Sequence, residues 1–365
     1  MKTTEPAASI ALPSSGKSIL ATGGELKNTF CLTKENRAFI SRPIGDLNDF
    51  QAYQHYQKAI GHYKERFNIK PEAIAHDMHP DYLSTRYAMA NQDSLPRIEV
   101  QHHHAHIASC MAEHRLHEEA IGVAFDGTGY GTDGNIWGGE FFVGGYKEFK
   151  RVYHLKYIPL PGGDKAALQP WRMAVSYIYQ TFNGGAPKFL SRWKDSNFII
   201  SMIEKRVNSP LTSSMGRLFD AVSSIAGVCD INTYEAEAPI RLEALCQKNT
   251  ESQSYPYRIE NEDIDVSAMI QEILRSGEKP EQIATRFHNT IADIVLKVCI
   301  KIREKYKIDK VILSGGVFQN KTLTKESVKL LKRLNFAVYT HSAVPPNDGG
   351  VSLGQAVIAQ QLGNF

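Results

Sequence analysis

The sequence lacks several features that would assign the protein to a narrow class. Its five cysteines are widely spaced and contain no C-x-x-C pair, so a disulfide scaffold is not expected and a reducing compartment fits. No apolar run approaches membrane-spanning length, and the N-terminus has no signal-peptide core. We therefore expect a cytoplasmic protein without a membrane partner. The net charge of only +3 gives no strong attraction to nucleic acid, and no nucleic-acid partner is expected.

The composition is that of an ordinary globular protein. Of the 365 residues, 42% are hydrophobic and 22% are charged, which favours two domains or one large bilobal domain. Residues 1–17 are rich in Ala, Pro, Ser and Thr, so we expect a linker or a cut edge there.

The most informative segment is a histidine cluster. Four of the five residues 102–106 are histidines, and residues 107–114 are predicted to be helical. His102 and His106 would then lie one turn apart on one face, close enough to hold a single metal ion such as zinc, iron, copper or nickel. His103 with His106 is a weaker pair, and a solvated helix face is an equally good interpretation. Two histidines do not complete a site, so carboxylates must come from elsewhere.

Two runs of predicted elements follow the same order, which indicates an α/β protein with a topological repeat. Each run has a strand, a glycine turn and a second strand, followed later by a strand, a loop and a helix. In the first run these elements are at 18–32, 73–75 and 83–91; in the second they are at 120–131, 141–144, 310–317 and 320–334. Glycine-tipped turns in any α/β protein are the alternative explanation.

The repeat predicts two lobes. We expect the first at 18–119 and the second at 120–348, with an insertion at about 151–282 and a C-terminal helix at 349–365 packed on the first lobe. Helices are predicted at 171–182 and 198–207 within the insertion. Apolar residues recur with a clear helical period over 283–305.

Two glycine-rich segments follow buried strands. They are Asp126-Gly-Thr-Gly-Tyr-Gly131 and Ser314-Gly-Gly-Val-Phe-Gln-Asn320, the second of which precedes a predicted helix. Glycines let backbone N–H groups approach phosphate oxygens, and a helix N-terminus favours anions. Tight turns are the plainer explanation. The second segment matches neither a Walker A loop nor G-x-G-x-x-G.

Carboxylates next to these segments would complete a metal site. Asp126 ends a strand, and Asp348 precedes a small-residue helix at 351–361, although capping that helix would by itself account for Asp348. With His102 and His106 they would form a two-His, two-Asp site, better suited to iron or zinc than to magnesium. Ser213 opens a further predicted helix, in which Gly216 would lie against adenine or ribose and Asp220 would accept hydrogen bonds from hydroxyls.

Taken in order, the motifs resemble the Kae1-like C-terminal half of HypF, the carbamoyltransferase family of NiFe-hydrogenase maturation. The resemblance covers nearly everything from residue 18 onward. The segments that carry it are Gly24-Glu-Leu-Lys-Asn-Thr29, His79-Pro-Asp-Tyr-Leu-Ser-Thr85, Gln101-His-His-His-Ala-His106, Asp126-Gly-Thr-Gly-Tyr-Gly131, Gly138-Gly-Glu140, Ser314-Gly-Gly-Val-Phe-Gln-Asn320 and Asn347-Asp-Gly-Gly350.

The resemblance implies the fold of actin, sugar kinases and Hsp70 (ASKHA), in which two ribonuclease-H-like lobes enclose a nucleotide cleft. It implies one divalent metal ion, iron or zinc, held by His102, His106, Asp126 and Asp348. The implied contacts to ATP or carbamoyladenylate are Gly127, Thr128, Gly129, Tyr130, Gly131, Gly216, Asp220, Gly315, Gly316 and Asn320. Lys27 and His79 are the implied catalytic residues, with Lys27 neutralising phosphate or carbamoyl oxygens.

The implied reaction is carbamoyl transfer from carbamoyladenylate, made from carbamoyl phosphate and ATP, to the C-terminal cysteine thiol of HypE. Full-length family members also carry acylphosphatase and YrdC-like domains, which this sequence lacks, so we expect only the transfer half of the reaction. An O-carbamoyltransferase of antibiotic biosynthesis and a tRNA threonylcarbamoyl transferase are the alternative enzymes. An ATP-binding module that docks a partner without chemistry is the alternative from another class.

Overall fold

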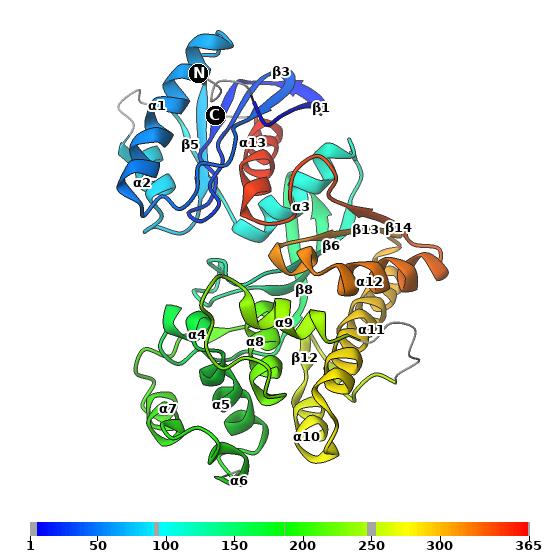
Figure 1. Ribbon diagram of the computed structural model, residues 1–365. Coiled ribbons are helices and arrows are strands. Elements are labelled where there is room, and N and C mark those ends of the chain that lie inside the picture. The colour runs from blue at the N-terminus through cyan, green and yellow to red at the C-terminus, as the bar shows by residue number, and fades with distance from the viewer. Residues whose placement is uncertain (1–5, 91–94, 186, 247–252, 364–365) are drawn as a thin grey trace.

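Two mixed sheets, one in each lobe, organise the computed structural model, which describes residues 6–90, 95–185, 187–246 and 253–363 (Figure 1). The first sheet has the order β1-β3-β2-β4-β5 and the second has the order β11-β12-β8-β7-β6-β13-β14. The strands of the first sheet are β1 (Ala8–Gly16), β2 (Ile19–Ala21), β3 (Cys31–Ile40), β4 (Ala73–Asp77) and β5 (Arg97–Val100). Those of the second are β6 (Ala120–Phe125), β7 (Gly139–Gly145), β8 (Glu148–Leu155), β11 (Arg258–Glu260), β12 (Asp263–Asp265), β13 (Lys310–Ser314) and β14 (Ala337–Thr340).

The two sheets share one topology. In the first, β2 pairs antiparallel with β3 and parallel with β4, and β4 pairs parallel with β5. In the second, β6 pairs antiparallel with β7 and parallel with β13, and β13 pairs parallel with β14. The helices alternate with these strands in the same order: α1 (Phe50–Arg66), α2 (Leu83–Ala90) and α3 (His102–Glu113) match α11 (Pro280–Tyr306), α12 (Lys321–Arg333) and α13 (Val351–Leu362). The duplicated ribonuclease-H-like fold is therefore present.

The last helix of each repeat packs on the sheet of the other lobe. Helix α3 contacts β6 and β13, whereas α13 contacts β2 and β3. The two helices also pack tightly on each other: a Cβ at Gly354 would lie 1.8 Å from the carbonyl oxygen of Ala105. Figure 1 shows α13 beside the strands of the upper lobe, with α3 between the lobes. Because of this exchange, the N-terminal end of α3 and the turn before α13 meet at the lobe interface.

The insertion in the second lobe is mostly helical. It contains α4 (Asp164–Leu168), α5 (Pro170–Thr181), α6 (Pro187–Leu190), α7 (Ser196–Glu204), α8 (Met215–Ile225), α9 (Glu237–Ala244), α10 (Ser267–Ser276) and the short strands β9 (Ile158–Pro159) and β10 (Leu211–Thr212). Its apolar faces share one core with α11 and the second sheet, in which Phe219 and Phe287 lie edge to face with centroids 4.7 Å apart. This core fixes α8 against the strand ends of the second lobe.

The predicted helices at 171–182, 198–207, 283–305, 320–334 and 351–361 are confirmed by α5, α7, α11, α12 and α13. The predicted helix at 83–91 is α2, although residue 91 lies outside the described part of the chain, as do 1–5 and 364–365. The linker prediction was wrong for residues 8–16, which form β1 and pair with β3 because Ile10 and Leu12 alternate into the core. Strand β8 also crosses the expected start of the insertion at 151 and pairs with β7.

Candidate metal centre and nucleotide cleft

Two histidines and two carboxylates from three parts of the fold meet at the lobe interface. The group consists of His102, His106, Asp126 and Asp348, whose ligand atoms all lie within 4.8 Å of one another. His102 and His106 come from the first turns of α3, Asp126 follows β6, and Asp348 starts the short helix η2 (Asp348–Gly350) before α13. The exchange of α3 and α13 between lobes is thus what brings the four side chains together.

Local capping fixes the two segments that are irregular. The side chain of Gln101 accepts a hydrogen bond from His104 N and starts α3, so both ligand-type histidines follow on one helical face. The Asn347 side chain accepts from Gly349 N, which holds the turn that presents Asp348. Asn347 caps only η2, whereas α13 begins without a side-chain cap. Asp348 therefore does not cap α13, and its carboxylate stays available to the cluster.

A buried carboxylate orients His102. The Nδ1–H of His102 donates to Asp77 Oδ2 over 2.7 Å. The other ring nitrogen, Nε2, therefore points at the cluster and lies 3.6 Å from both Asp126 Oδ2 and Asp348 Oδ1. This Nε2 is buried and has no hydrogen-bond partner among the described residues. Burial would lower the pKa of His102, but the three carboxylates outweigh burial and raise it well above the usual value. A buried imidazole nitrogen facing two carboxylates is the arrangement that a cation fits.

Asp126 is held from several sides. Its Oδ1 accepts from Gly127 N over 2.8 Å and from Gly316 N over 3.3 Å, and its Oδ2 lies 2.9 Å from His106 Nε2. Although burial acts to raise its pKa, hydrogen bonds from the two histidines hold the pKa of Asp126 well below its usual value. The side chains of Asp126 and Asp348 are 12% and 21% exposed, whereas both histidines are 1% exposed. The cluster therefore opens to solvent on its carboxylate side.

The other two histidines of the segment are not part of the cluster. His103 supports the first glycine segment: a Cβ at Gly129 would lie 2.4 Å from His103 Cε1. His104 lies edge-on to Phe142 with ring centroids 5.0 Å apart. Burial lowers the pKa of His103 well below its usual value and that of His104 to about 4, so both are neutral packing residues. The weaker pair considered, His103 with His106, does not form the cluster.

The glycine segments converge around Asp126 because close backbone contacts leave no room for side chains. A Cβ at Gly216, in the first turn of α8, would lie 2.9 Å from Gly127 Cα. Gly315 has φ +100°, and a Cβ there would lie 2.2 Å from the carbonyl oxygen of Phe125. Four glycines therefore lie close together around Asp126, and the segment 127–131 extends from this place. They are Gly127, Gly216, Gly315 and Gly316. The N–H groups of Gly127 and Gly316, however, donate to Asp126 in this structure.

Two of the predicted nucleoside contacts are occupied by protein partners. Asp220 is fully buried, and its carboxylate lies 2.8 Å from Arg217 Nε. Burial raises the pKa of Asp220 to about 6, although Arg217 acts against this shift. Asn320 caps α12 by accepting from Leu323 N over 2.8 Å, and its Nδ2 donates to His288 over 2.8 Å. Asp220 lies in α8 and Asn320 begins α12, both in the second lobe, and their contact with a nucleoside stays a prediction.

The two predicted catalytic residues are not members of the ligand cluster. Both lie on the first lobe and contact residues of the second. Lys27 forms a 2.6 Å ion pair with Glu235, which belongs to the insertion. His79 stacks on Tyr82 with centroids 4.2 Å apart and meets Tyr130 edge to face at 5.6 Å. Burial lowers the pKa of His79. Their catalytic roles stay predictions.

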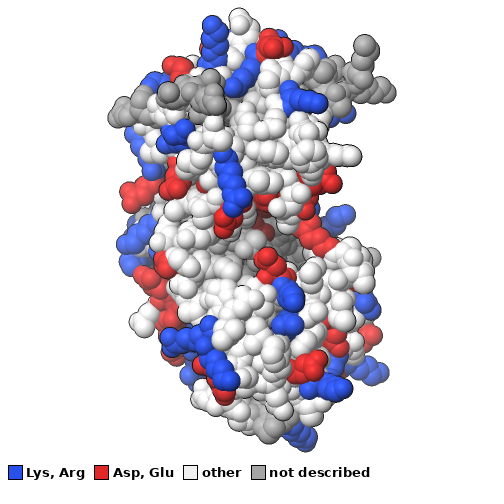
Figure 2. Space-filling view, turned by 90° about the vertical axis from the view of Figure 1, so that its left-hand side faces the viewer, with Lys and Arg blue, Asp and Glu red and all other residues white. Residues whose placement is uncertain are grey.

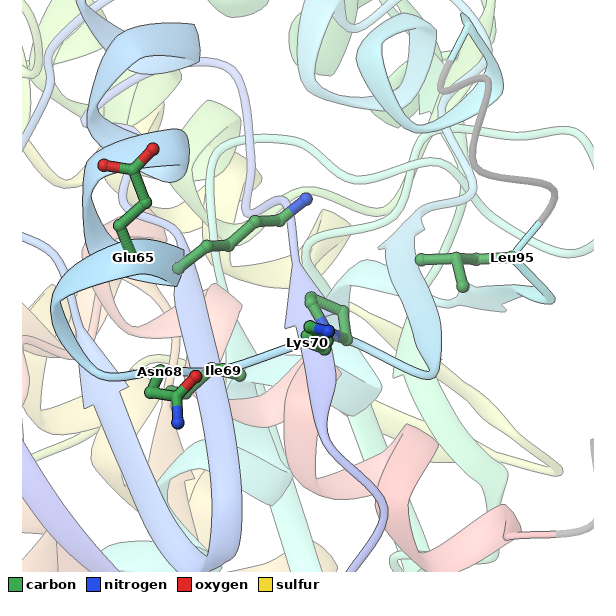
Figure 3. Close-up of a pocket in the computed structure, with 7 residues that line it drawn as sticks. Glu65, Asn68, Ile69, Lys70 and Leu95 are labelled. Carbon is green, nitrogen blue, oxygen red and sulfur yellow. The ribbon is translucent and has the colours of Figure 1, made fainter.

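The lobe interface is open on one face of the molecule. Figure 2 shows a hollow across the middle of that face, with acidic side chains on its rim. A separate cavity of about 510 Å³ lies at the end of α1 and is lined by residues that include Lys64, Asn68, Lys70 and Leu95 (Figure 3). None of these residues belongs to the cluster, so the cavity carries no part of the site. In the described part of the chain, no helix has both the length and the apolarity needed to cross a membrane.

Asp77 is the site residue that the sequence did not single out. The available signal was its position at the end of the buried strand β4, beside the edge where the other strand ends meet. Its partner His102 is 25 residues away in the sequence, so no local spacing indicated the pair. Tyr82 and Trp137, which pack against His79 and His103, were likewise not singled out.

Two ribonuclease-H-like lobes with glycine segments at their interface define an α/β protein of the ASKHA type. Two family models match, the "HypF Kae1-like domain" over residues 14–113 and "Carbamoyltransferase, Kae1-like Domain, second subdomain" over residues 122–355. The chain belongs to the HypF family of carbamoyltransferases and corresponds to its Kae1-like region.

Both full-length HypF proteins and a shorter homolog resemble this chain. The chain is 37% identical to carbamoyltransferase HypF of Synechocystis, covering 96% of this chain and 48% of that protein. A carbamoyltransferase HypF homolog of Cupriavidus necator is 33% identical, with 93% of this chain and 91% of the homolog covered. The crystal structure of full-length HypF in its phosphate- and nucleotide-bound form matches with a TM-score of 0.92 at 43% identity, covering 98% of this chain and 48% of that one. The chain thus spans about half the length of the full-length relatives.

Proposed function

We propose that this chain carries out the transfer step of a cytoplasmic carbamoyltransferase. A carbamoyl group would pass from carbamoyladenylate to the C-terminal cysteine thiol of HypE during synthesis of the cyanide ligand of NiFe-hydrogenase. The observation that carries the proposal is the meeting of His102, His106, Asp126 and Asp348 beside the converging glycine segments. Membership of the HypF family supports the choice of reaction.

Carbamoyladenylate is a mixed anhydride whose carbonyl is already activated by its AMP leaving group. The enzyme needs to hold the phosphate, keep water from the carbamoyl group and admit the thiol. A full-length HypF relative has been solved in a phosphate- and nucleotide-bound form, which supports a ligand of this kind for the family. The segment 127–131, Gly216 at the start of α8 and Gly315-Gly316 are the backbone surfaces on which the phosphate would rest.

The four clustered side chains would hold one divalent cation, either iron or zinc. Two imidazole nitrogens and two carboxylate oxygens suit these metals, and the unpartnered Nε2 of His102 gains a partner when one binds. The chemistry that the metal supplies is Lewis-acid stabilisation of charge on the phosphate side of the substrate. Asp77 fixes the orientation of His102 throughout.

The remaining steps belong to residues on the cleft walls. The attacking thiol sulfur forms a bond to the carbamoyl carbon, the bond from that carbon to the AMP oxygen breaks, and a thiocarbamate and AMP result. Lys27 would leave its present ion pair with Glu235 and neutralise the phosphate of the substrate instead. His79 would accept the thiol proton, because its lowered pKa leaves it neutral near neutral pH. Positioning of the two reactants supplies much of the remaining acceleration.

The proposal also assigns partners. Carbamoyladenylate would come from acylphosphatase and YrdC-like domains, in the same chain or supplied in trans, and HypE would dock over the hollow between the lobes. None of the five cysteines is needed as a nucleophile, and four of them are buried.

The direct test supplies the chain with zinc or iron, preformed carbamoyladenylate and HypE. The expected result is one added carbamoyl group on the C-terminal peptide of HypE, detected by mass spectrometry, together with one AMP per group transferred. His79→Gln should lower the turnover rate more than the affinity for carbamoyladenylate, since it leaves the metal cluster intact.

The matched controls are HypE without its C-terminal cysteine and the exposed substitution His117→Gln on this chain. The first should receive no carbamoyl group, and the second should leave the rate unchanged. If the chain binds ATP and HypE but transfers no carbamoyl group from carbamoyladenylate, the proposed enzymatic activity would be refuted. That result would favour the alternative of an ATP-binding module that docks a partner without chemistry.

A further inference from the structure

A second group of metal-ligand side chains lies at the other end of α3. Cys110, Glu113 and His114 offer a thiol, a carboxylate and an imidazole whose ligand atoms all lie within 4.8 Å of one another. Their spacing of three and four residues places them on one helical face at the C-terminal turn of α3. None of the residues of the cleft cluster belongs to this group, and the cleft cluster contains no thiol.

The thiol and the carboxylate of this group are shielded from solvent. Cys110 is fully buried, and the Glu113 side chain is only 1% exposed. Burial, together with the nearby Glu113 carboxylate, raises the pKa of the Cys110 thiol well above its usual value. A divalent cation would offset both effects, because it deprotonates a coordinating thiol and neutralises a neighbouring carboxylate.

The surrounding hydrogen bonds orient two of the three side chains, His114 and Glu113. His114 donates from Nε2 to the carbonyl oxygen of Thr340 over 2.8 Å, which leaves Nδ1 with a lone pair for a metal. Glu113 accepts from the backbone N–H of Ala343 over 2.6 Å, which fixes the carboxylate. His341 adjoins the group, with its Nδ1 3.1 Å from Glu113 Oε1.

His341 places a second, buried imidazole at the border of the group. Its side chain is 2% exposed, yet Nδ1 has no hydrogen-bond partner of acceptable geometry among the described residues. The other ring nitrogen, Nε2, is bonded to Ser314 Oγ over 2.7 Å. The His341 Nδ1 therefore faces the Glu113 carboxylate at 3.1 Å, which brings a further imidazole nitrogen to the edge of the three candidate ligands.

We propose that Cys110, Glu113 and His114, bordered by His341, form a second metal site, specific for a thiophilic divalent cation such as Zn²⁺. A thiolate with imidazole and carboxylate ligands selects such a cation over magnesium or calcium. Binding there would tie the end of α3 to the segment 340–343 that follows β14.

Cobalt substitution distinguishes this site from the cleft cluster. A cobalt ion bound by thiolate has a sulfur-to-metal charge-transfer absorption in the near ultraviolet, whereas a site of histidines and aspartates has none. Titration of the metal-free chain with Co²⁺ should reach two equivalents, and one of them should carry this absorption. Absence of the absorption at saturating Co²⁺ in the wild-type chain would overturn the proposal without any variant.

Three variants locate the absorption. Cys110→Ala should abolish it and remove one equivalent of cobalt while the other remains, and Cys299→Ala, another buried cysteine on a different helix, should change neither. His114→Ala should weaken thiophilic binding at least about tenfold, and it serves as the test if Cys110→Ala fails to fold. Absorption that persists in Cys110→Ala, or undiminished affinity in His114→Ala, would refute the assignment.

Discussion

The orientation of His102 by Asp77 gives the sharpest prediction for the cleft cluster. Asp77→Asn keeps the size of the side chain and can still accept from His79 N, but it removes the charge 2.7 Å from His102 Nδ1. Both side chains are almost completely buried, with 1% and 0% exposure, so solvent does not screen the interaction. A partner of this kind is worth about tenfold to hundredfold in metal affinity, which corresponds to about 1.4 to 2.8 kcal/mol.

The assay is competition between the protein and a chromogenic chelator for Zn²⁺ at fixed pH. Asp348→Asn, which alters a proposed ligand, should lose more affinity than Asp77→Asn. The matched control is Asp81→Asn, an exposed carboxylate in the same loop that pairs with Arg86. Unchanged zinc affinity in Asp77→Asn, with the wild-type affinity retained in Asp81→Asn, would refute the view that Asp77 positions a metal ligand.

Two further predictions concern the packing and the pH dependence of the fold. Gly354→Ala should lower the free energy of unfolding by more than about 2 kcal/mol, because the added Cβ would lie 1.8 Å from the carbonyl oxygen of Ala105. The control Gly61→Ala, whose Cβ would have nothing within 4 Å, should be neutral or stabilising. Equal effects of the two substitutions in thermal unfolding would contradict this prediction. Burial raises the pKa of Glu140 from 4.5 to about 8, against the hydrogen bond from Ser213. Between pH 4.5 and about 8 the Glu140 carboxyl is ionised in the unfolded chain but still protonated in the folded one, so the free energy of unfolding decreases as the pH rises. Denaturant titrations at about pH 6 and about pH 8.5 should show a smaller decrease for Glu140→Gln than for the wild-type protein. Parallel pH profiles for the two proteins would show that Glu140 is not the group responsible.

Much of the secondary structure could be predicted from local patterns. The apolar period over 283–305 indicated α11, and the glycine-tipped hairpins indicated the repeated units. The failure at residues 8–16 has a clear cause. The Ala, Pro and Ser composition suggested a linker, but alternating Ile10 and Leu12 gain burial against β3, and this partner is distant in sequence. Pairing with a distant strand outweighed local composition.

The four residues of the cluster were predicted together as one two-His, two-Asp site, but the residue that orients one of them was not predicted. His102 and His106 follow from helical spacing, and Asp126 and Asp348 from strand and helix ends. Asp77 was missed because its contact with His102 depends on how β4 and α3 pack. The same packing makes His103 and His104 supporting residues, although their side chains are chemically identical to those of the proposed ligands.

The sequence by itself determined which chemical groups are available and which of them share a helical turn or a strand end. The helix at 349–365 was already expected to pack on the first lobe. Only the tertiary structure decided that α3 packs in return on the second sheet, and that groups from both ends of the chain thereby meet at one point. The physical reason is that helical spacing is set by backbone geometry within a few residues. Meeting across lobes is set by burial of apolar helix faces against distant strands, which no local pattern encodes.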